Sequence, residues 1–180
     1  MHERDPLIDV LDEGRADEGL TMRARERSLW AAAEESAQLA GTLVDLAERG
    51  SPVAVRSQTG RTHHGALAVV GADFCVVRAD NGTEVHVRLS AIATVRPHPG
   101  ERHAAATGDR GAVLDRLLTE VLGRVAQERR RVTLVTRGGD VVAGRLRAVG
   151  ADVVSVDLDG GGRQPCYVAA AAVTEVIVDR

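Results

Sequence analysis

The chain contains a long internal repeat, which constrains its fold more than any other feature. Residues 53–80 align with residues 132–159 without a gap at a constant offset of 79, and ten of these 28 pairs are identical. The identical pairs are Val53/Val132, Gly60/Gly139, Gly65/Gly144, Leu67/Leu146, Val70/Val149, Gly71/Gly150, Ala72/Ala151, Asp73/Asp152, Val77/Val156 and Asp80/Asp159. Beyond the turn at Asn81-Gly82 the offset becomes 81, so that Val87 meets Val168 and Ile92 meets Val173. Self-similarity of this kind predicts two structural units with the same order of elements.

Each copy begins with a helical pattern and continues with short β-rich runs. Leu39, Leu43 and Leu46 are spaced as one face of a helix, which predicts a helix over 22–49, and the second copy predicts one over 113–130. Runs rich in β-branched residues follow, separated by Gly and Asn-Gly turns. The expected strands are 52–57, 62–70, 73–79, 84–89 and 92–96 in the first copy, and 132–136, 141–149, 152–158, 163–168 and 173–178 in the second.

These patterns predict a mainly β fold of two tandem five-stranded antiparallel small barrels, each preceded by an α-helix. We expect an acidic flexible tail at 1–21, a first unit at 22–97, a linker at 98–111 and a second unit at 112–180. Residues 1–20 carry seven acidic and two basic side chains, with too little apolar surface to offset chain ordering. Small open barrels leave free strand edges, so we expect a homo-oligomer that satisfies one edge pairing within the chain and others between chains.

Two stretches of the first copy resemble a known family. G-A-L-A-V-V-G-A-D at 65–73 is similar to the Sm-like family, and S-A-I-A-T-V-R-P at 90–97 resembles the close of its bacterial Hfq core. G-R-L-R-A-V-G-A-D at 144–152 follows the same pattern. The resemblance covers about residues 36–97 and 113–178. It implies a ring-forming scaffold that binds single-stranded RNA.

The RNA-binding residues of that family transfer only in part. Hfq-like proteins carry a Tyr-Lys-His triplet where this chain has Arg88, Leu89 and Ser90, which leaves Arg88 and Phe74 as the residues that inherit an RNA role. Aromatic residues for base stacking make up only 2% of the chain, but all 23 basic residues are Arg, whose planar guanidinium stacks on bases and binds phosphate. The further candidates are Arg56, Arg61, Arg78, Arg96, Arg137, Arg145, Arg147 and Arg163. The alternative is that these side chains form an ordinary solvated surface.

Other kinds of site lack support in the sequence. His63 and His64 are adjacent on an expected strand, so they point to opposite faces and cannot share a metal ion. Cys75 and Cys166 lie in apolar strands and are expected to be core or sheet thiols. No phosphate-binding loop or catalytic constellation is present, so we expect no enzyme activity, no cofactor and no small-molecule substrate.

The remaining expectations concern location and function. No apolar run is long enough to cross a membrane and the first residues are acidic, so we expect a cytoplasmic protein with no membrane partner. The leading hypothesis is a noncatalytic RNA-binding or RNA-associated protein. The alternative is a structural or protein-interaction scaffold that has lost RNA binding, which the missing triplet, the scarce aromatics and the net charge of −3 favour.

Overall fold

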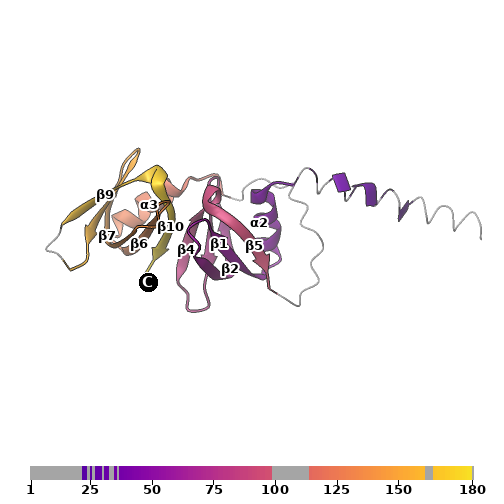
Figure 1. The fold of residues 1–180 in the computed structure, drawn as a ribbon, viewed down its shortest axis with the longest axis horizontal. Coiled ribbons are helices and arrows are strands. Elements are labelled where there is room, and N and C mark those ends of the chain that lie inside the picture. The colour runs from indigo at the N-terminus through magenta and orange to yellow at the C-terminus, as the bar shows by residue number, and fades with distance from the viewer. Residues whose placement is uncertain are drawn as a thin grey trace, which may run out of the picture.

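The computed structural model describes residues 37–98, 114–160 and 164–179, together with single positions between 22 and 35 (Figure 1). In repeat 1 the elements are α2 (Leu39–Glu48), β1 (Pro52–Ser57), β2 (Thr62–Val70), β3 (Phe74–Arg78), β4 (Glu84–Arg88), the 3-10 turn η1 (Leu89–Ala91) and β5 (Ile92–Pro97). In repeat 2 they are α3 (Leu118–Gln127), β6 (Arg131–Thr136), β7 (Val141–Val149), β8 (Val153–Leu158), β9 (Pro165–Ala169), η2 (Ala170–Ala172) and β10 (Val173–Val178). All ten predicted strands are therefore present. The predicted acidic tail and nearly all of the predicted linker lie outside the described residues.

The ten strands form one continuous antiparallel sheet, so the prediction of two separate five-stranded barrels is wrong. The strand order is β5-β1-β2-β3-β4-β10-β6-β7-β8-β9, which leaves the sheet open with β5 and β9 at its ends. The sheet is continuous because the last strand of repeat 2, β10, pairs with β4 of repeat 1. Figure 1 shows the two repeats side by side along the long axis of the molecule, with β4 and β10 between them.

The internal repeat is preserved in the strand register. Val53 of β1 pairs with Pro97 of β5. The equivalent residues of repeat 2, Val132 of β6 and Val178 of β10, pair in the same way. Both β1–β2 and β6–β7 end in a tight turn whose glycine, Gly60 or Gly139, has a positive φ of 86° or 90°. This is a backbone region that residues with a Cβ rarely adopt. Positions related by the offsets of 79 and 81 are therefore structurally equivalent.

Each repeat has its own hydrophobic core, but repeat 1 also contributes to the core of repeat 2. α2 packs on β2, and its Leu43 is fully buried with Val55, Cys75 and Val77. α3 packs on β7, where Leu122 joins the second core. Strand β3 is buried on both faces because each face contributes to a different core. Alternate side chains of a strand point to opposite faces. Those of Phe74 and Val76 join the core of repeat 2, while those of Cys75 and Val77 belong to repeat 1.

The helices are shorter than the apolar spacing predicts. The described positions between Met22 and Glu35 are helical, but Ala37 and Gln38 are not. Gln38 has an extended backbone with φ −109° and ψ 149°, so α2 begins at Leu39 and the predicted single helix over 22–49 is interrupted. Among the described residues, none of the helices has the length and apolar character needed to span a bilayer.

Candidate functional site

The most elaborate cluster of polar side chains lies where the two repeats meet. We call the β4–β10 pair and the side chains around it the seam. Along it, Glu175, Val176 and Ile177 lie opposite Val87, His86 and Val85. One surface of the sheet faces the core of repeat 1 and becomes the outer face of repeat 2. The opposite surface faces the core of repeat 2 and becomes the outer face of repeat 1. The seam therefore buries side chains on both faces.

Glu175 is a fully buried carboxylate on the face of the seam that repeat 1 covers. Its exposed fraction is 0%. The Thr59 hydroxyl donates to Oε1 at 2.7 Å, and His63 Nε2 donates to Oε2 at 2.7 Å. Arg61 Nε lies 3.6 Å from Oε2. All three donors come from the β1–β2 hairpin, so this hairpin of repeat 1 packs over β10 of repeat 2.

The hairpin holds Glu175 in its charged form. Burial alone raises the pKa of a carboxylate because it removes water from the charge. Here hydrogen bonds from His63, Ser57 and Thr59, together with the charge of His63, outweigh burial and lower the pKa of Glu175 from 4.5 to about 2. A buried charge is stabilising only with such a complete set of partners. The cluster therefore ties the two repeats together through specific geometry.

Arg88 forms a second polar cluster across the seam. Its Nη1 lies 2.5 Å from Asp73 Oδ2, while Nε and Nη2 donate to the carbonyl oxygens of Val173 and Ala170 at 3.0 and 3.2 Å. The other carboxylate oxygen of Asp73 accepts the Leu118 backbone N–H at 2.7 Å, at the first turn of α3. Carboxylates are favourable at helix N-termini, where backbone N–H groups lack partners. Asp73 and Arg88 thus position both α3 and the start of β10.

Phe74 and His86 fill the other face of the seam. Phe74 is 1% exposed, and its ring stacks on that of His86 with centroids 6.0 Å apart. His86 is 5% exposed, and its Nδ1 has no hydrogen-bond partner among the described residues. Burial lowers the pKa of His86. The negative charge of Glu84 raises this pKa and the positive charge of Arg130 lowers it further, and the net shift is downward. Burial inside the seam therefore favours the neutral form of the ring.

The structure buries Phe74 and partly buries Arg88, the two residues that the resemblance predicts to inherit an RNA role. Phe74 lies in the core of repeat 2, and three of the Arg88 nitrogens are engaged by protein oxygens. Base stacking and phosphate binding require an exposed ring face and a free guanidinium. Both side chains are instead used for joining the repeats.

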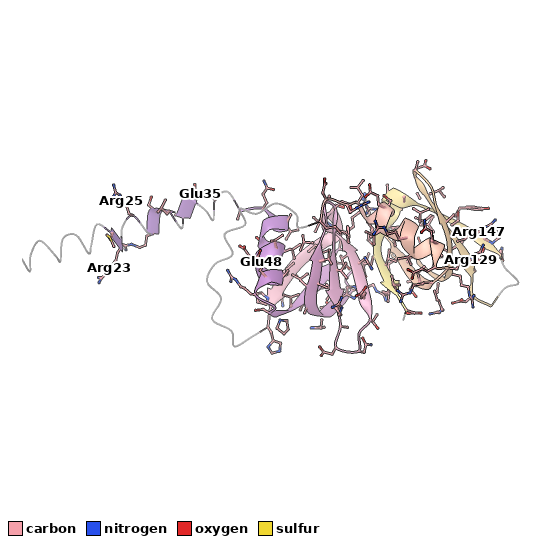
Figure 2. All side chains as sticks on the ribbon, turned by 180° about the vertical axis from the view of Figure 1, so that it is seen from behind. Arg23, Arg25, Glu35, Glu48, Arg129 and Arg147 are labelled. Carbon is pink, nitrogen blue, oxygen red and sulfur yellow. The ribbon has the colours of Figure 1, made fainter. Side chains whose placement is uncertain are left out.

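The other candidate arginines do not form one patch. Arg61 faces Glu175 from the hairpin, and Arg147 Nη1 lies 4.0 Å from Asp157 Oδ1. Among the described residues Arg56, Arg137 and Arg145 are exposed and have no ion-pair partner. Figure 2 shows Arg129 and Arg147 near the end of repeat 2 that is remote from repeat 1. The candidates thus lie on separate parts of both repeats, and Arg163 is outside the described residues.

Carboxylates accompany several of the remaining arginines. Arg78 pairs with Glu84 at 2.9 Å, and Arg131 pairs with Asp159 at 2.8 Å and also with Asp179. The hydrogen bonds that Arg131 donates to both carboxylates raise its pKa. Alternating charges of this kind cancel at a distance, in contrast to the continuous positive stripe that nucleic acids attract.

Two open grooves lie on the described surface, one on each repeat. The first, of about 560 Å³, lies over β5, β1 and β2. Its lining residues are Pro52, Val53, Ala54, His64, Gly65, Asp80, Arg96, Pro97 and His98. The second, of about 450 Å³, runs between the β6–β7 hairpin and β9. Its lining residues are Thr136, Gly138, Asp140, Val142, Cys166, Tyr167, Val168, Ala169 and Ala172.

The described residues contain no cluster of three or more His, Cys, Asp or Glu that could hold a metal ion. Cys75 is buried, and burial raises the pKa of its thiol to about 12, so it is not an activated nucleophile. Cys166 is partly exposed on β9. Among the described side chains, neither thiol has the basic neighbour that nucleophilic catalysis needs.

The sequence pattern did not identify Glu175 or its partners. The signal that could have found Glu175 is a single acidic residue inside the otherwise apolar strand V-T-E-V-I-V. Its equivalent in repeat 1 is Thr94, which is exposed on β5. A carboxylate that appears in only one copy of an internal repeat indicates a contact that only this copy makes. Here that contact is the pairing of β10 with repeat 1.

The chain was also compared with known proteins. No protein-family model matches it, and no curated protein sequence matches it significantly. The Sm-like resemblance stays a prediction from the residues alone.

Proposed function

We propose that the protein is a noncatalytic scaffold that assembles with further copies of itself by pairing strand edges. The observation that carries this proposal is the seam. One repeat already accepts the last strand of the other through β4 and β10, with one buried and one partly buried polar cluster that fix the fit. The equivalent edges at the two ends of the sheet, β9 and β5, have a partner strand on one side only. Such edges recruit other strands unless they are blocked.

Backbone geometry supports pairing of moderate strength at these edges. The N–H of His98 donates to the carbonyl oxygen of Pro52 in β1, and the carbonyl oxygen of Gln164 accepts from the N–H of Leu158 in β8. Backbone N–H and C=O groups alternate in direction along a strand. The free edges of the sheet therefore receive the backbone groups of Val95 and Pro97 in β5 and of Pro165 and Tyr167 in β9. Proline has no N–H to donate, so the edges offer fewer hydrogen bonds than the seam. We expect reversible, concentration-dependent association.

The test is sedimentation velocity over a dilution series, with one backbone variant. Tyr167→Pro removes an outward N–H from β9, while its exposed side chain means that little packing is lost. Tyr167→Ala removes the side chain and keeps the N–H, and is the matched control. We expect the wild type and Tyr167→Ala to associate and Tyr167→Pro to stay monomeric with an unchanged circular dichroism spectrum. A wild type that sediments as a monomer at every concentration would refute the scaffold.

RNA binding is the second candidate, and the groove on β5, β1 and β2 favours it. Arg96 and His64 line it, as does the acidic Asp80, and Arg56 follows the lining residue Ala54 by two positions on the same face of β1. Fluorescence anisotropy with short A-rich and U-rich RNAs over a salt series tests this candidate. Phosphate contacts from arginine predict weak sequence preference and a steep salt dependence. Binding that survives an Arg56→Ala, Arg96→Ala double variant would exclude this groove as the RNA site.

A further inference from the structure

The groove along β9 is the empty counterpart of the place that β10 occupies on repeat 1. By the offsets of the internal repeat, its lining residues Thr136, Gly138, Asp140 and Val142 correspond to the β1–β2 hairpin, and Cys166, Tyr167, Val168 and Ala169 to β4. On repeat 1 the equivalent hairpin and strand contact β10: the hairpin binds Glu175 and β4 pairs with its strand. The groove therefore has the lining of a strand-binding slot. We call it the β9 slot.

The charges of the two slots are opposite. In repeat 1 the hairpin presents Arg61 and His63 to the buried Glu175. The equivalent positions in the β9 slot are Asp140 and Val142. Asp140 is exposed, its carboxylate accepts the Thr136 hydroxyl at 3.1 Å, and it has no ion-pair partner among the described residues. A strand that carried an acidic residue like Glu175 would meet a like charge there.

The opposite end of the described sheet carries the complementary charge. β5 is the repeat 1 equivalent of β10, and Thr94 and Arg96 stand where β10 has Glu175 and Ile177. Arg56 is the Cα partner of Thr94 on β1, so both arginines flank Thr94 on the outer face. Arg96 and Arg56 are exposed, with no ion-pair partner among the described residues. Asp80 is the acidic residue among those that line the same groove.

We propose that the β9 slot receives β5 of a second copy, and that Asp140 with Arg96 and Arg56 selects this partner by charge. The proposal rests on the scaffold function above and specifies its contact. Asp140 favours the Thr94 strand with its two arginines and rejects a strand like β10 with its acid. Like charges brought together at an interface disfavour wrong partners strongly. Assembly is then head to tail, with repeat 2 of one copy against repeat 1 of the next.

Charge reversal tests this contact. Asp140→Arg and Arg96→Asp are each expected to weaken self-association at least tenfold in sedimentation velocity, because each places like charges in the slot. An equimolar mixture of the two single variants associates, because the unchanged Asp140 of one variant meets the unchanged Arg96 of the other; this shows that each variant keeps its second edge intact. The double variant Asp140→Arg, Arg96→Asp regains self-association. Glu128→Arg and Arg129→Asp, two exposed positions after α3, are the charge-matched controls and leave association unchanged.

The outcomes separate this contact from the scaffold itself. If the wild type associates and Tyr167→Pro does not, but both charge variants associate like the wild type, edge pairing holds and the charge selection is wrong. If the single variants are weakened but the double variant does not recover, the pairing of Asp140 with Arg96 is also wrong. If the wild type is monomeric throughout, the scaffold function fails and this contact with it.

Discussion

Replacement of Glu175 by Gln is expected to destabilise the protein in a way that depends on pH. Gln keeps the shape of the side chain but removes the charge that lowers the pKa of the carboxyl from 4.5 to about 2. At about 1.4 kcal/mol per pKa unit, this shift contributes on the order of 3 kcal/mol to folding at neutral pH. Because the folded-state pKa is lowered, that contribution is complete above about pH 4.5 and is lost as the pH falls towards 2.

The measurement is urea unfolding followed by circular dichroism at a series of pH values from 7 to 2. We expect Glu175→Gln to be less stable than the wild type by about 3 kcal/mol at pH 7, with the gap closing between pH 4.5 and 2. Glu120→Gln is the control, because Glu120 and Arg116 are both 49% exposed and lie 3.8 Å apart. Such exposed pairs contribute less than about 1 kcal/mol. A gap at Glu175 that is below 1 kcal/mol, or that does not change with pH, would refute the reasoning.

Three further predictions concern other parts of the seam and the sheet. Arg88→Ala removes an ion pair and two hydrogen bonds from a side chain that is only 16% exposed, and is expected to lower the unfolding free energy by about 2–4 kcal/mol in urea titration. Gly144→Val places a Cβ 2.1 Å from the Asp157 carbonyl oxygen and is expected to lower the melting temperature, while Gly123→Ala, with open space around it, leaves it unchanged or raises it. A thiol reagent is expected to label Cys166 in the native protein and to reach the buried Cys75 only on unfolding, and early labelling of Cys75 would contradict its placement.

The strands could be predicted from the sequence because their signals are local. Alternating apolar residues and turn glycines such as Gly60 and Gly139 mark each strand and its end within a few residues. The internal repeat then transfers each assignment to the other copy. The interruption at Gln38 gives no such signal, because Ala37 and Gln38 are both compatible with a helix. The predicted helix over 22–49 was therefore too long.

The continuity of the sheet could not be predicted in the same way. Whether a five-stranded unit closes on itself or pairs with its neighbour depends on contacts between residues about ninety positions apart, such as Val87 with Glu175. One signal of this pairing was present in the sequence. Ala68 and Val76 are apolar in repeat 1 and pack against the core of repeat 2, but their equivalents in repeat 2 are Arg147 and Ser155. An outer strand face that is apolar in only one copy indicates that only this copy is covered.

The same asymmetry sets the strength expected for contacts with a second copy. In the seam, Phe74, Val76 and Ala68 of repeat 1 pack against the core of repeat 2. The equivalent face of repeat 2 carries Ser155 and the exposed Arg147, which a partner would have to desolvate.

A second copy therefore gains its contacts from the β9 edge and from the charges of the β9 slot rather than from a broad apolar face. Contacts between exposed charges are screened by salt, whereas burial of apolar surface is not. The seam should then persist at high ionic strength while association between copies weakens. Sedimentation velocity of the wild type over a sodium chloride series, with urea unfolding at the same salt concentrations, measures the two responses separately. Association that strengthens with salt would show that apolar contacts dominate and that the charges of the slot do not select the partner.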